Sequence, residues 1–287
     1  MVFNGRLNIA IVIVSYNSAD YLVDCIRYLR EQSYLPSEVI VVDNGSENQN
    51  ELQSLLGCAF FPNFQINLIL LDKNTGYSAA NNFAFQNLSN NIDVVIFLNP
   101  DAYLIDKKFI EKVAEYFGSE NSADFISAKL LRFNNFEKTP STIIDSTGIT
   151  QTWYGRWVDR GAGEVDCGQY DISVHQDIQA VCGAAFIAKK NVLDVVVQKE
   201  GYLFNESFFM YKEDIELSLR IRKFGFELAY VPHLVAYHCR GWQSRKSMSP
   251  FAKKLSARND LIVAWRYSKK ALPFTLLKYM LFFIFRV

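Results

Sequence analysis

Cysteine is scarce in this sequence, and the cysteines that are present form no recognisable pattern. The 287 residues include five cysteines, which are widely spaced and contain no C-x-x-C pair. An odd number at such spacings argues against both a disulfide framework and a zinc knuckle. The expected environment is a reducing one, and we predict a cytoplasmic protein.

An excess of charge of either sign is also missing. Lysine plus arginine number 30, aspartate plus glutamate number 30, and the formal net charge is zero. Nucleic-acid binding draws mainly on a surplus of positive charge that neutralises phosphates. No nucleic-acid partner is therefore predicted. Hydrophobic residues make up 50% of the chain, which is enough to fill a large core.

The hydrophobic runs near the two ends are short. Residues 7–14, LNIAIVIV, are too short and too rich in β-branched residues for a signal peptide, and we expect them to form the first strand. Residues 271–287, ALPFTLLKYMLFFIFRV, would extend roughly 25 Å as a helix, less than a hydrocarbon core of about 30 Å. Two interpretations stay open for this segment. It either lies in the membrane plane, on the cytoplasmic face of the inner membrane, or packs on the domain or on a second subunit of a homodimer.

What the sequence does contain is a regular alternation of strands and helices. Apolar runs typical of strands buried on both faces precede segments with helical spacing of apolar residues, from about residue 6 to about residue 120. Another strand, helix and strand follow within residues 178–238. We predict one mixed α/β domain over residues 1–265, with a nucleotide-binding half at about 6–120 and an acceptor half at about 121–265. Residues 266–287 are predicted to form a basic and apolar helical appendage.

Polar residues follow the predicted strands at the points where they end. Because ligands of open α/β sheets bind at the carboxyl ends of the strands, these positions mark the candidate site. They are Ser15, Tyr16, Asn17, Asp43, Asn44, Ser46, Asn74, Gly76, Asn99 and Asp101. A dinucleotide site is not supported, because the first turn, VSYNSADY, has no glycine that would let a pyrophosphate approach the backbone.

The tripeptide Asn99-Pro100-Asp101 closes one of these strands. Pro100 removes a ladder donor and keeps Asn99 extended, so that Asp101 is presented at the rim of the sheet. A hard divalent cation such as Mg²⁺ or Mn²⁺ binds one or two carboxylates together with phosphate oxygens and water. The motif therefore fits a metal-assisted diphosphate site, and an ordinary Asn-Pro-Asp turn is the alternative.

Two further groups of charged residues lie in the C-terminal half. Glu213 and Asp214 fall in the first turn of a predicted helix, where they either cap that helix or supply a general base for an incoming hydroxyl. His238 ends a predicted strand and precedes a basic, glycine-containing stretch that includes Trp242 and Arg245. That histidine is either structural or part of a diphosphate site closed by a lid.

Seven segments, taken together and in this order, resemble the landmarks of the family 2 glycosyltransferases, which have the GT-A fold. They are VIVSYN, VIVVDNGS, NTGYSAANN, FLNPDA, GAAFIAKK, FFMYKEDIELSLR and VPHLVAYH. The resemblance covers about residues 8–265. The NPD form and the segments IDSTG and SARNDLIVAWRY look most like bacterial dTDP-rhamnosyltransferases of O-antigen and other cell-surface polysaccharide synthesis. The resemblance implies an inverting, metal-dependent hexosyltransferase. Its donor would be dTDP-rhamnose, and its acceptor a saccharide or a lipid-linked saccharide.

The resemblance also implies roles for individual residues. Tyr16 would stack near the nucleotide base and Asp43 would hydrogen-bond to it. Asp101 and His238 would bind Mg²⁺ or Mn²⁺, and Asp214 would be the catalytic base. The other implied residues are Ser15, Asn74, Gly76 and Asn99 in the nucleotide-sugar pocket, and Cys182, Gly183, Ala184, Glu213, Trp242 and Arg245 on the acceptor side or in the lid.

The sequence departs from the family pattern at five positions, two of which are Lys189 and Lys190, where arginine is often found. Asn99 replaces the first acid of a D-x-D motif, Lys212 stands where an aromatic is common, and Glu216 replaces an aspartate. Another UDP- or dTDP-sugar is the alternative donor. Two other functions are alternatives: a nucleotidyltransferase, which would need a glycine-rich phosphate loop that this sequence lacks, and a non-catalytic glycan-binding subunit. Retention of the acidic residues and the histidine argues against the latter.

Overall fold

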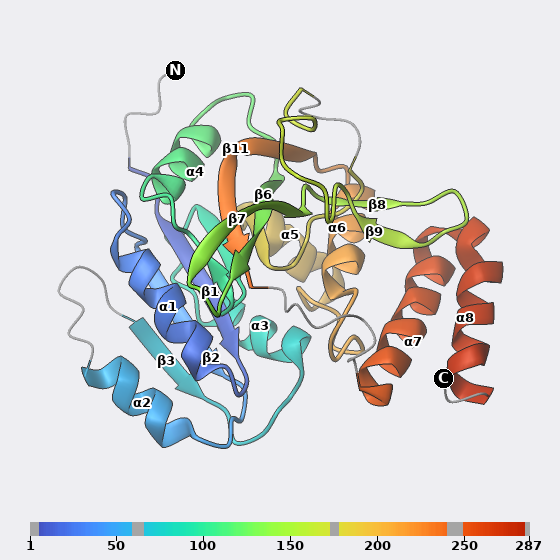
Figure 1. Ribbon diagram of the computed structural model, residues 1–287, viewed down its shortest axis with the longest axis horizontal. Coiled ribbons are helices and arrows are strands. Elements are labelled where there is room, and N and C mark those ends of the chain that lie inside the picture. The colour runs from blue at the N-terminus through green and yellow to red at the C-terminus, as the bar shows by residue number, and fades with distance from the viewer. Residues whose placement is uncertain (1–5, 59–65, 173–177, 240–248, 285–287) are drawn as a thin grey trace.

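The N-terminal half of the computed structural model alternates strands and helices. The structure describes residues 6–58, 66–172, 178–239 and 249–284. The first elements are β1 (Ile9–Ser15), α1 (Ala19–Arg30), β2 (Glu38–Asp43), α2 (Gln49–Cys58), β3 (Ile66–Leu70), α3 (Tyr77–Gln86) and β4 (Val94–Leu98). The predicted order of this half is confirmed (Figure 1).

The C-terminal half adds strands to the same sheet, forms a second sheet of two strands and ends in a pair of helices. Its elements are β5 (Ala102–Tyr103), α4 (Phe109–Phe117), β6 (Phe125–Asn134), β7 (Thr139–Ser146), β8 (Ile149–Gln151), β9 (Trp157–Asp159), β10 (Ala185–Lys189), α5 (Lys190–Glu200), α6 (Glu213–Lys223), β11 (Leu228–His238), α7 (Pro250–Tyr267), the short 3₁₀ helix η2 (Lys269–Ala271) and α8 (Leu272–Ile284).

One mixed sheet joins the two halves. Its nine strands run in the order β3-β2-β1-β4-β10-β6-β11-β5, with β7 paired to β6. The pairs from β3 to β4 are parallel, β10 is antiparallel to both neighbours, and β11 is parallel to β6. The predicted mixed α/β sheet is confirmed. Because β1, β2 and β4 are parallel, their carboxyl ends meet at one edge.

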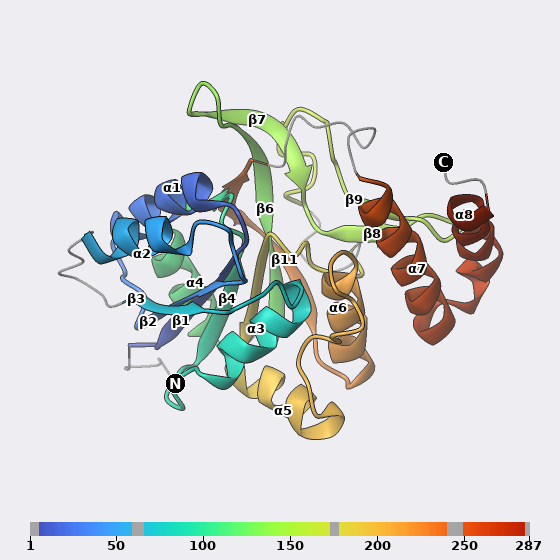
Figure 2. The same ribbon diagram turned by 90° about the horizontal axis from the view of Figure 1, so that it is seen from below.

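Both faces of the sheet are covered, as the β-branched runs predict. Alternate residues of β1 enter two different cores: Ile9, Ile11 and Ile13 pack with α1, α2 and α4, whereas Ala10 and Val12 pack with α3, α5 and α6. Figure 2 shows these helices on opposite faces of the strands. The cores therefore fix the strand ends, and with them the positions of the polar residues that follow each strand.

The α7–α8 hairpin stands at one end of the molecule, next to α6 and away from the sheet (Figure 1). The boundary predicted at residues 265/266 falls within the last turn of α7, which runs to Tyr267, and α8 forms the terminal helix. Within the described ranges no helix is both long and apolar enough to cross a membrane.

Candidate active site

Ser15 and Asp43 lie side by side at the carboxyl ends of β1 and β2. Asp43 is fully buried, and its carboxylate accepts hydrogen bonds from Ser46 N at 2.9 Å, Ser46 Oγ at 2.6 Å and Gln49 Nε2 at 2.8 Å. Neighbouring Tyr16 is exposed at the same rim. A carboxylate has about four acceptor positions, and three of those of Asp43 are used within this loop, so Asp43 shapes the loop that follows β2.

Asn74 and Gly76 form a turn that is organised by Asn44. The Asn44 amide donates to Asn74 Oδ1 at 3.1 Å and to the Gly76 carbonyl at 3.2 Å, while its Oδ1 accepts from Thr75 N at 2.9 Å. Gly76 has φ +89°, and a Cβ there would lie 2.6 Å from the Phe209 ring. The sequence places Asn44 among the polar residues at the end of its strand, directly after Asp43 in the segment VIVVDNGS, but does not indicate that it organises this turn.

Asp101, directly before β5, faces His238 at the end of the neighbouring strand β11. Its Oδ1 lies 3.4 Å from His238 Nε2, and Nδ1 of the same ring lies 2.8 Å from Asp145 Oδ2. The antiparallel pairing of β5 with β11, in which Ala102 is opposite His238, produces this arrangement. Asp145 and His238 are buried, whereas Asp101 is partly open to solvent. The structure therefore brings the two predicted metal ligands together and adds Asp145 as the group that orients the ring.

The electrostatic surroundings of His238 favour a cation. Burial alone would lower the pKa of His238, but the Asp101 and Asp145 carboxylates outweigh it and raise the pKa to about 10. A divalent cation at Nε2 would replace one proton while Asp145 holds Nδ1, as is usual for metal-binding histidines. The two groups thus fit such an ion.

The protein supplies only part of a coordination shell. Among the residues that the structure describes, no three His, Cys, Asp or Glu side chains are grouped to hold a metal. An ion at Asp101 and His238 would take its other ligands from diphosphate oxygens and water, which Mg²⁺ and Mn²⁺ accept. The predicted lid residues Trp242 and Arg245 lie outside the described residues.

Residues 182–184 connect the Asn99 turn to Asp214. The Asn99 N–H donates to the Ala184 carbonyl at 3.0 Å, and the Gly183 N–H donates to Asp214 Oδ2 at 2.9 Å. Cys182 is buried beside them. A Cβ on Gly183 would lie 3.2 Å from the Asp214 Cβ, so a side chain at this position would crowd the carboxylate. The three residues predicted for the acceptor side therefore lie between the two acidic groups.

Glu213 is buried at the N-terminus of α6, and the neighbouring Asp214 is half-buried. Burial raises the pKa of Glu213 to about 8, and the neighbouring Asp214 charge adds to the rise. Burial also raises the pKa of Asp214, while the hydrogen bond from Gly183 opposes the rise. Glu213 Oε2 has no hydrogen-bond partner within the described part of the chain. The pair therefore holds at least one carboxyl group that gains a proton readily.

Asn259 of α7 fixes the loop that leads into α6. Its Nδ2 donates to the carbonyl oxygens of Met210 at 3.0 Å and Tyr211 at 2.8 Å. Tyr211 and Lys212 have φ values of +70° and +71°, the left-handed region that costs energy for residues with side chains. Sequence reasoning did not identify Asn259 as a site residue. Its segment, SARNDLIVAWRY, was noted only for its resemblance to the family.

Asp260, the next residue, adds charged contacts between the same elements. Its carboxylate lies 3.7 Å from Lys212 Nζ and 2.5 Å from Lys278 Nζ of α8. Asp260 thus links α7 to both α8 and Lys212, the residue that precedes Glu213.

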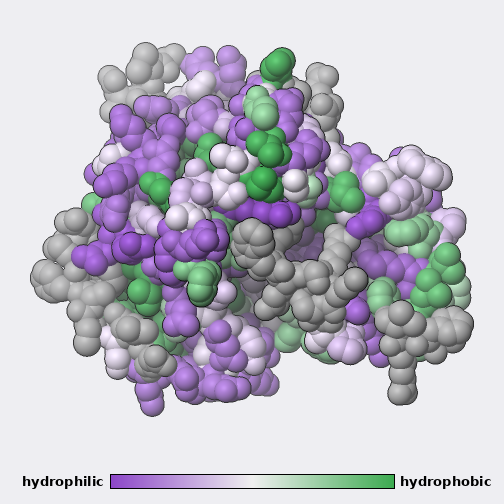
Figure 3. Space-filling view, in the orientation of Figure 1, coloured by the Kyte–Doolittle hydropathy of each residue, from purple (hydrophilic) through white to green (hydrophobic). Residues whose placement is uncertain are grey.

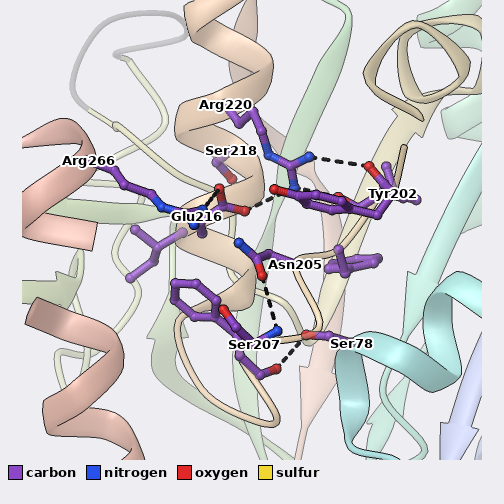
Figure 4. Close-up of polar contacts among 12 residues, drawn as sticks. Ser78, Tyr202, Asn205, Ser207, Glu216, Ser218, Arg220 and Arg266 are labelled. Atoms are coloured by element: carbon purple, nitrogen blue, oxygen red, sulfur yellow. Dashed lines mark hydrogen bonds and ion pairs between the residues drawn. The ribbon is translucent and has the colours of Figure 1, made fainter. Parts of the chain in front are cut away.

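A buried ion pair continues this contact along α6 (Figure 4). Glu216 and Arg220 are almost fully buried and lie 2.9 Å apart. The Tyr267 hydroxyl donates to Glu216 Oε1 at 2.7 Å, and Arg266 Nη1 lies 3.5 Å from the same oxygen. Glu216, which replaces the aspartate common in the family, therefore joins α6 to α7.

The fold and the residues at its strand ends define a GT-A type α/β protein. The chain belongs to the family described as Glycosyl transferase family 2, whose sequence profile matches residues 10–164, more than half of the chain. It is 30% identical over 120 residues to the uncharacterized glycosyltransferase YwdF of Bacillus subtilis, a match that spans 42% of this chain and 41% of YwdF.

Two other proteins match over a longer part of the chain. Agl10 of Haloferax volcanii, a low-salt glycan biosynthesis hexosyltransferase, is 26% identical over 264 residues, which are 90% of this chain and 75% of Agl10. The mannosyltransferase PcManGT from Pyrobaculum calidifontis, solved with GDP-Man and Mn²⁺, aligns with a TM-score of 0.60 and 14% identity, covering 97% of this chain and 70% of that one. This last likeness concerns the fold.

Proposed function

We propose that the protein is an inverting glycosyltransferase that moves a sugar from a nucleotide-sugar donor to a hydroxyl group of an acceptor. The observation that carries the proposal is the placement of two acidic groups on either side of residues 182–184. Asp101 with His238 lies on one side and Asp214 on the other. One group suits a diphosphate with its cation, and the other suits the acceptor hydroxyl.

Asp101 and His238 would hold Mg²⁺ or Mn²⁺ together with the donor diphosphate. The cation, when bound, neutralises charge that builds up on the departing diphosphate. Asp145 keeps the His238 ring in place through Nδ1. PcManGT was solved with GDP-Man and Mn²⁺, which supports a donor and a cation of these classes for this chain.

Asp214 acts as the general base. The N–H groups of Gly183 and Ile215 hold its carboxylate at 2.9 Å and 2.8 Å, and its raised pKa favours taking a proton. The acceptor oxygen forms a bond to the anomeric carbon, the bond from that carbon to the diphosphate breaks, and the acceptor proton passes to Asp214. General-base assistance of this kind contributes about 10²- to 10⁴-fold.

The proposed donor is dTDP-rhamnose, and the proposed acceptor is a saccharide or lipid-linked saccharide of a bacterial cell-surface glycan. The segments IDSTG and SARNDLIVAWRY and the NPD form support this choice, with another UDP- or dTDP-sugar as the alternative. Agl10, a hexosyltransferase of glycan biosynthesis, supports a glycan product. Peripheral attachment to the cytoplasmic face of the membrane through the C-terminal helix belongs to the same proposal, and a homodimer stays a prediction.

A donor screen tests the proposal. The purified protein is incubated with dTDP-rhamnose and with UDP- and GDP-sugars, each with Mg²⁺, Mn²⁺ or EDTA, and sugar transfer and thermal stability are both recorded. A ligand at about 100 times its dissociation constant adds about 2.7 kcal/mol to the free energy of unfolding. The matched variants are Asp214→Asn and, as a surface control, Asp194→Asn on α5. Normal transfer by a folded Asp214→Asn protein would show that the base is misassigned.

A further inference from the structure

A groove of about 680 Å³ lies between α7 and α8. Its walls are mainly apolar and include Leu261, Ile262, Leu272 and Leu276. Trp265 also lines it, with 64% of its surface exposed. The lining includes none of the residues proposed to bind the donor or the cation or to act as the base. A volume of this size accommodates a small molecule or part of a lipid chain.

Two arginines lie in this apolar wall. Arg258 Nη1 donates to the Ser207 carbonyl at 2.7 Å and to its neighbour Asn259 at 3.3 Å, and within the described residues it has no carboxylate partner. Arg266 also lines the groove and lies 3.5 Å from Glu216 Oε1. A guanidinium has five N–H donors, so each arginine has donors left for an anion.

The Glu216 charge is already matched without Arg266. Arg220, at 2.9 Å, and the Tyr267 hydroxyl, at 2.7 Å, are its close partners, and the contact to Arg266 is the longest of the three. Figure 4 shows Arg266 reaching across from α7 to this carboxylate. The groove therefore holds two positive charges. One of them, on Arg266, only loosely contacts a carboxylate that Arg220 and Tyr267 already satisfy. This arrangement favours an anionic group in the ligand.

The hairpin as a whole is basic and apolar. Residues 250–284 contain seven lysines and arginines and one acidic residue, Asp260, which is paired with Lys212 and Lys278. Leu277, Met280 and Leu281 of α8 are exposed, and Figure 3 shows hydrophobic residues gathered over this helix. A second copy of the chain would bring an equally basic hairpin against this one, so charge favours an anionic lipid as the partner.

We propose that the groove binds the phosphate-bearing end of a single anionic lipid chain. The phosphate lies between Arg258 and Arg266, and the chain packs on Leu261, Ile262 and Leu276. The groove adjoins the catalytic helix, because Arg266 contacts Glu216, two residues beyond Asp214. The role of this site, holding the lipid carrier of an acceptor beside α6, rests on the proposed function, whereas lipid binding itself does not.

A binding experiment with a soluble analogue tests the site without catalysis. Dodecyl phosphate below its micelle concentration is titrated into the full-length protein, and tryptophan emission is recorded. The Trp265→Phe variant identifies the part of the signal that comes from the groove. Dodecyl maltoside supplies a chain without charge, and inorganic phosphate supplies charge without a chain. We expect saturable binding of dodecyl phosphate, at least about tenfold tighter than either partial analogue.

Two neighbouring substitutions on α8 locate the binding. Leu276→Glu places a carboxylate in the groove wall. Leu277→Glu places the same charge one residue further on, outside the groove lining. The two leucines are similarly exposed, at 47% for Leu276 and 53% for Leu277. Repulsion from the phosphate should weaken dodecyl phosphate binding at least about tenfold in Leu276→Glu and leave it nearly unchanged in Leu277→Glu.

A charge-neutralising pair provides an independent check. Arg258→Gln with Arg266→Gln should remove the preference for dodecyl phosphate over dodecyl maltoside. Lys253→Gln with Lys270→Gln, which changes the same charge outside the groove lining, should preserve that preference. Equal weakening by Leu276→Glu and Leu277→Glu, or equal affinity for the phosphate and the maltoside, would overturn the proposal.

The outcomes separate this site from the proposed function. Selective loss of dodecyl phosphate binding in Leu276→Glu, in a protein that transfers no sugar, supports the groove and counts against the transferase. Sugar transfer by a protein whose groove shows no saturable dodecyl phosphate binding supports the transferase and overturns the groove proposal. Dimerisation that is abolished by both glutamate variants, without saturable lipid binding, would assign the hairpin to a second copy and overturn the lipid proposal.

Discussion

Asn259 Nδ2 donates a hydrogen bond to the Tyr211 carbonyl at 2.8 Å, which ties α7 to the loop that enters α6. The same amide reaches the Met210 carbonyl at 3.0 Å. Two consecutive residues of this loop have left-handed backbone conformations, and the contact from α7 compensates for their cost. The C-terminal hairpin therefore takes part in placing Glu213 and Asp214.

Replacing Asn259 by leucine should loosen this loop. The variant keeps the side-chain volume but leaves two partly buried carbonyl groups without their donor. Each unpaired carbonyl should lower the free energy of unfolding by at most about 1–3 kcal/mol. We expect a lower free energy of unfolding in urea and a loss of transfer rate that exceeds any change in donor affinity. Asn87→Leu is the control, because the exposed Asn87 amide also donates to a backbone carbonyl, that of Phe83. Asn87→Leu should change the free energy of unfolding by only about 0.5 kcal/mol.

The strand ends could be predicted from the sequence because apolar runs such as Ile9–Val14 have one reading, a strand buried on both faces. The polar residues that follow each run then meet at one edge. The contact between Asp101 and His238 could be expected only from resemblance, since it depends on β11 pairing with β5 far away in the sequence. Asn259 could not be found in this way, because a buried asparagine on a helix has no distinguishing spacing.

The buried pair of Glu216 and Arg220 should stabilise the fold far more than a surface pair of the same geometry. Arg220→Met leaves a buried carboxylate with fewer partners, and we expect a loss of about 3–5 kcal/mol. Lys190 and Asp194 have the same spacing and the same 2.9 Å distance, but Asp194 is about half exposed. Lys190→Met should therefore cost less than about 1 kcal/mol. Urea unfolding of both variants measures the difference, and equal losses would contradict it.

The raised pKa of Glu213 predicts a pH-dependent stability. Its pKa is about 8 in the folded protein and 4.5 in the unfolded chain, so between these values the folded state holds more protons. Stability from this group is complete below about pH 4.5 and is lost as the pH rises to about 8. Glu213→Gln should flatten the decline, whereas Glu200→Gln, at the exposed end of α5, should leave it unchanged. Unfolding free energies from pH 5 to 9 give the comparison, and an identical slope in Glu213→Gln and the wild type would disprove the assignment.

Asp145 should control metal affinity through His238 without touching the ion. Its carboxylate lies 2.8 Å from His238 Nδ1, and loss of such a partner weakens metal binding by about 10- to 100-fold. We expect Asp145→Asn to shift the Mn²⁺ titration of thermal stability, measured with the donor diphosphate present, to higher concentration by that factor. Excess Mn²⁺ should restore transfer in this variant, because Asp101 and His238 are intact. Asp101→Asn should not be restored in this way, since it removes the carboxylate itself, and Asp194→Asn should titrate as the wild type does. A Mn²⁺ midpoint that is the same in Asp145→Asn and the wild type would show that Asp145 serves only the fold.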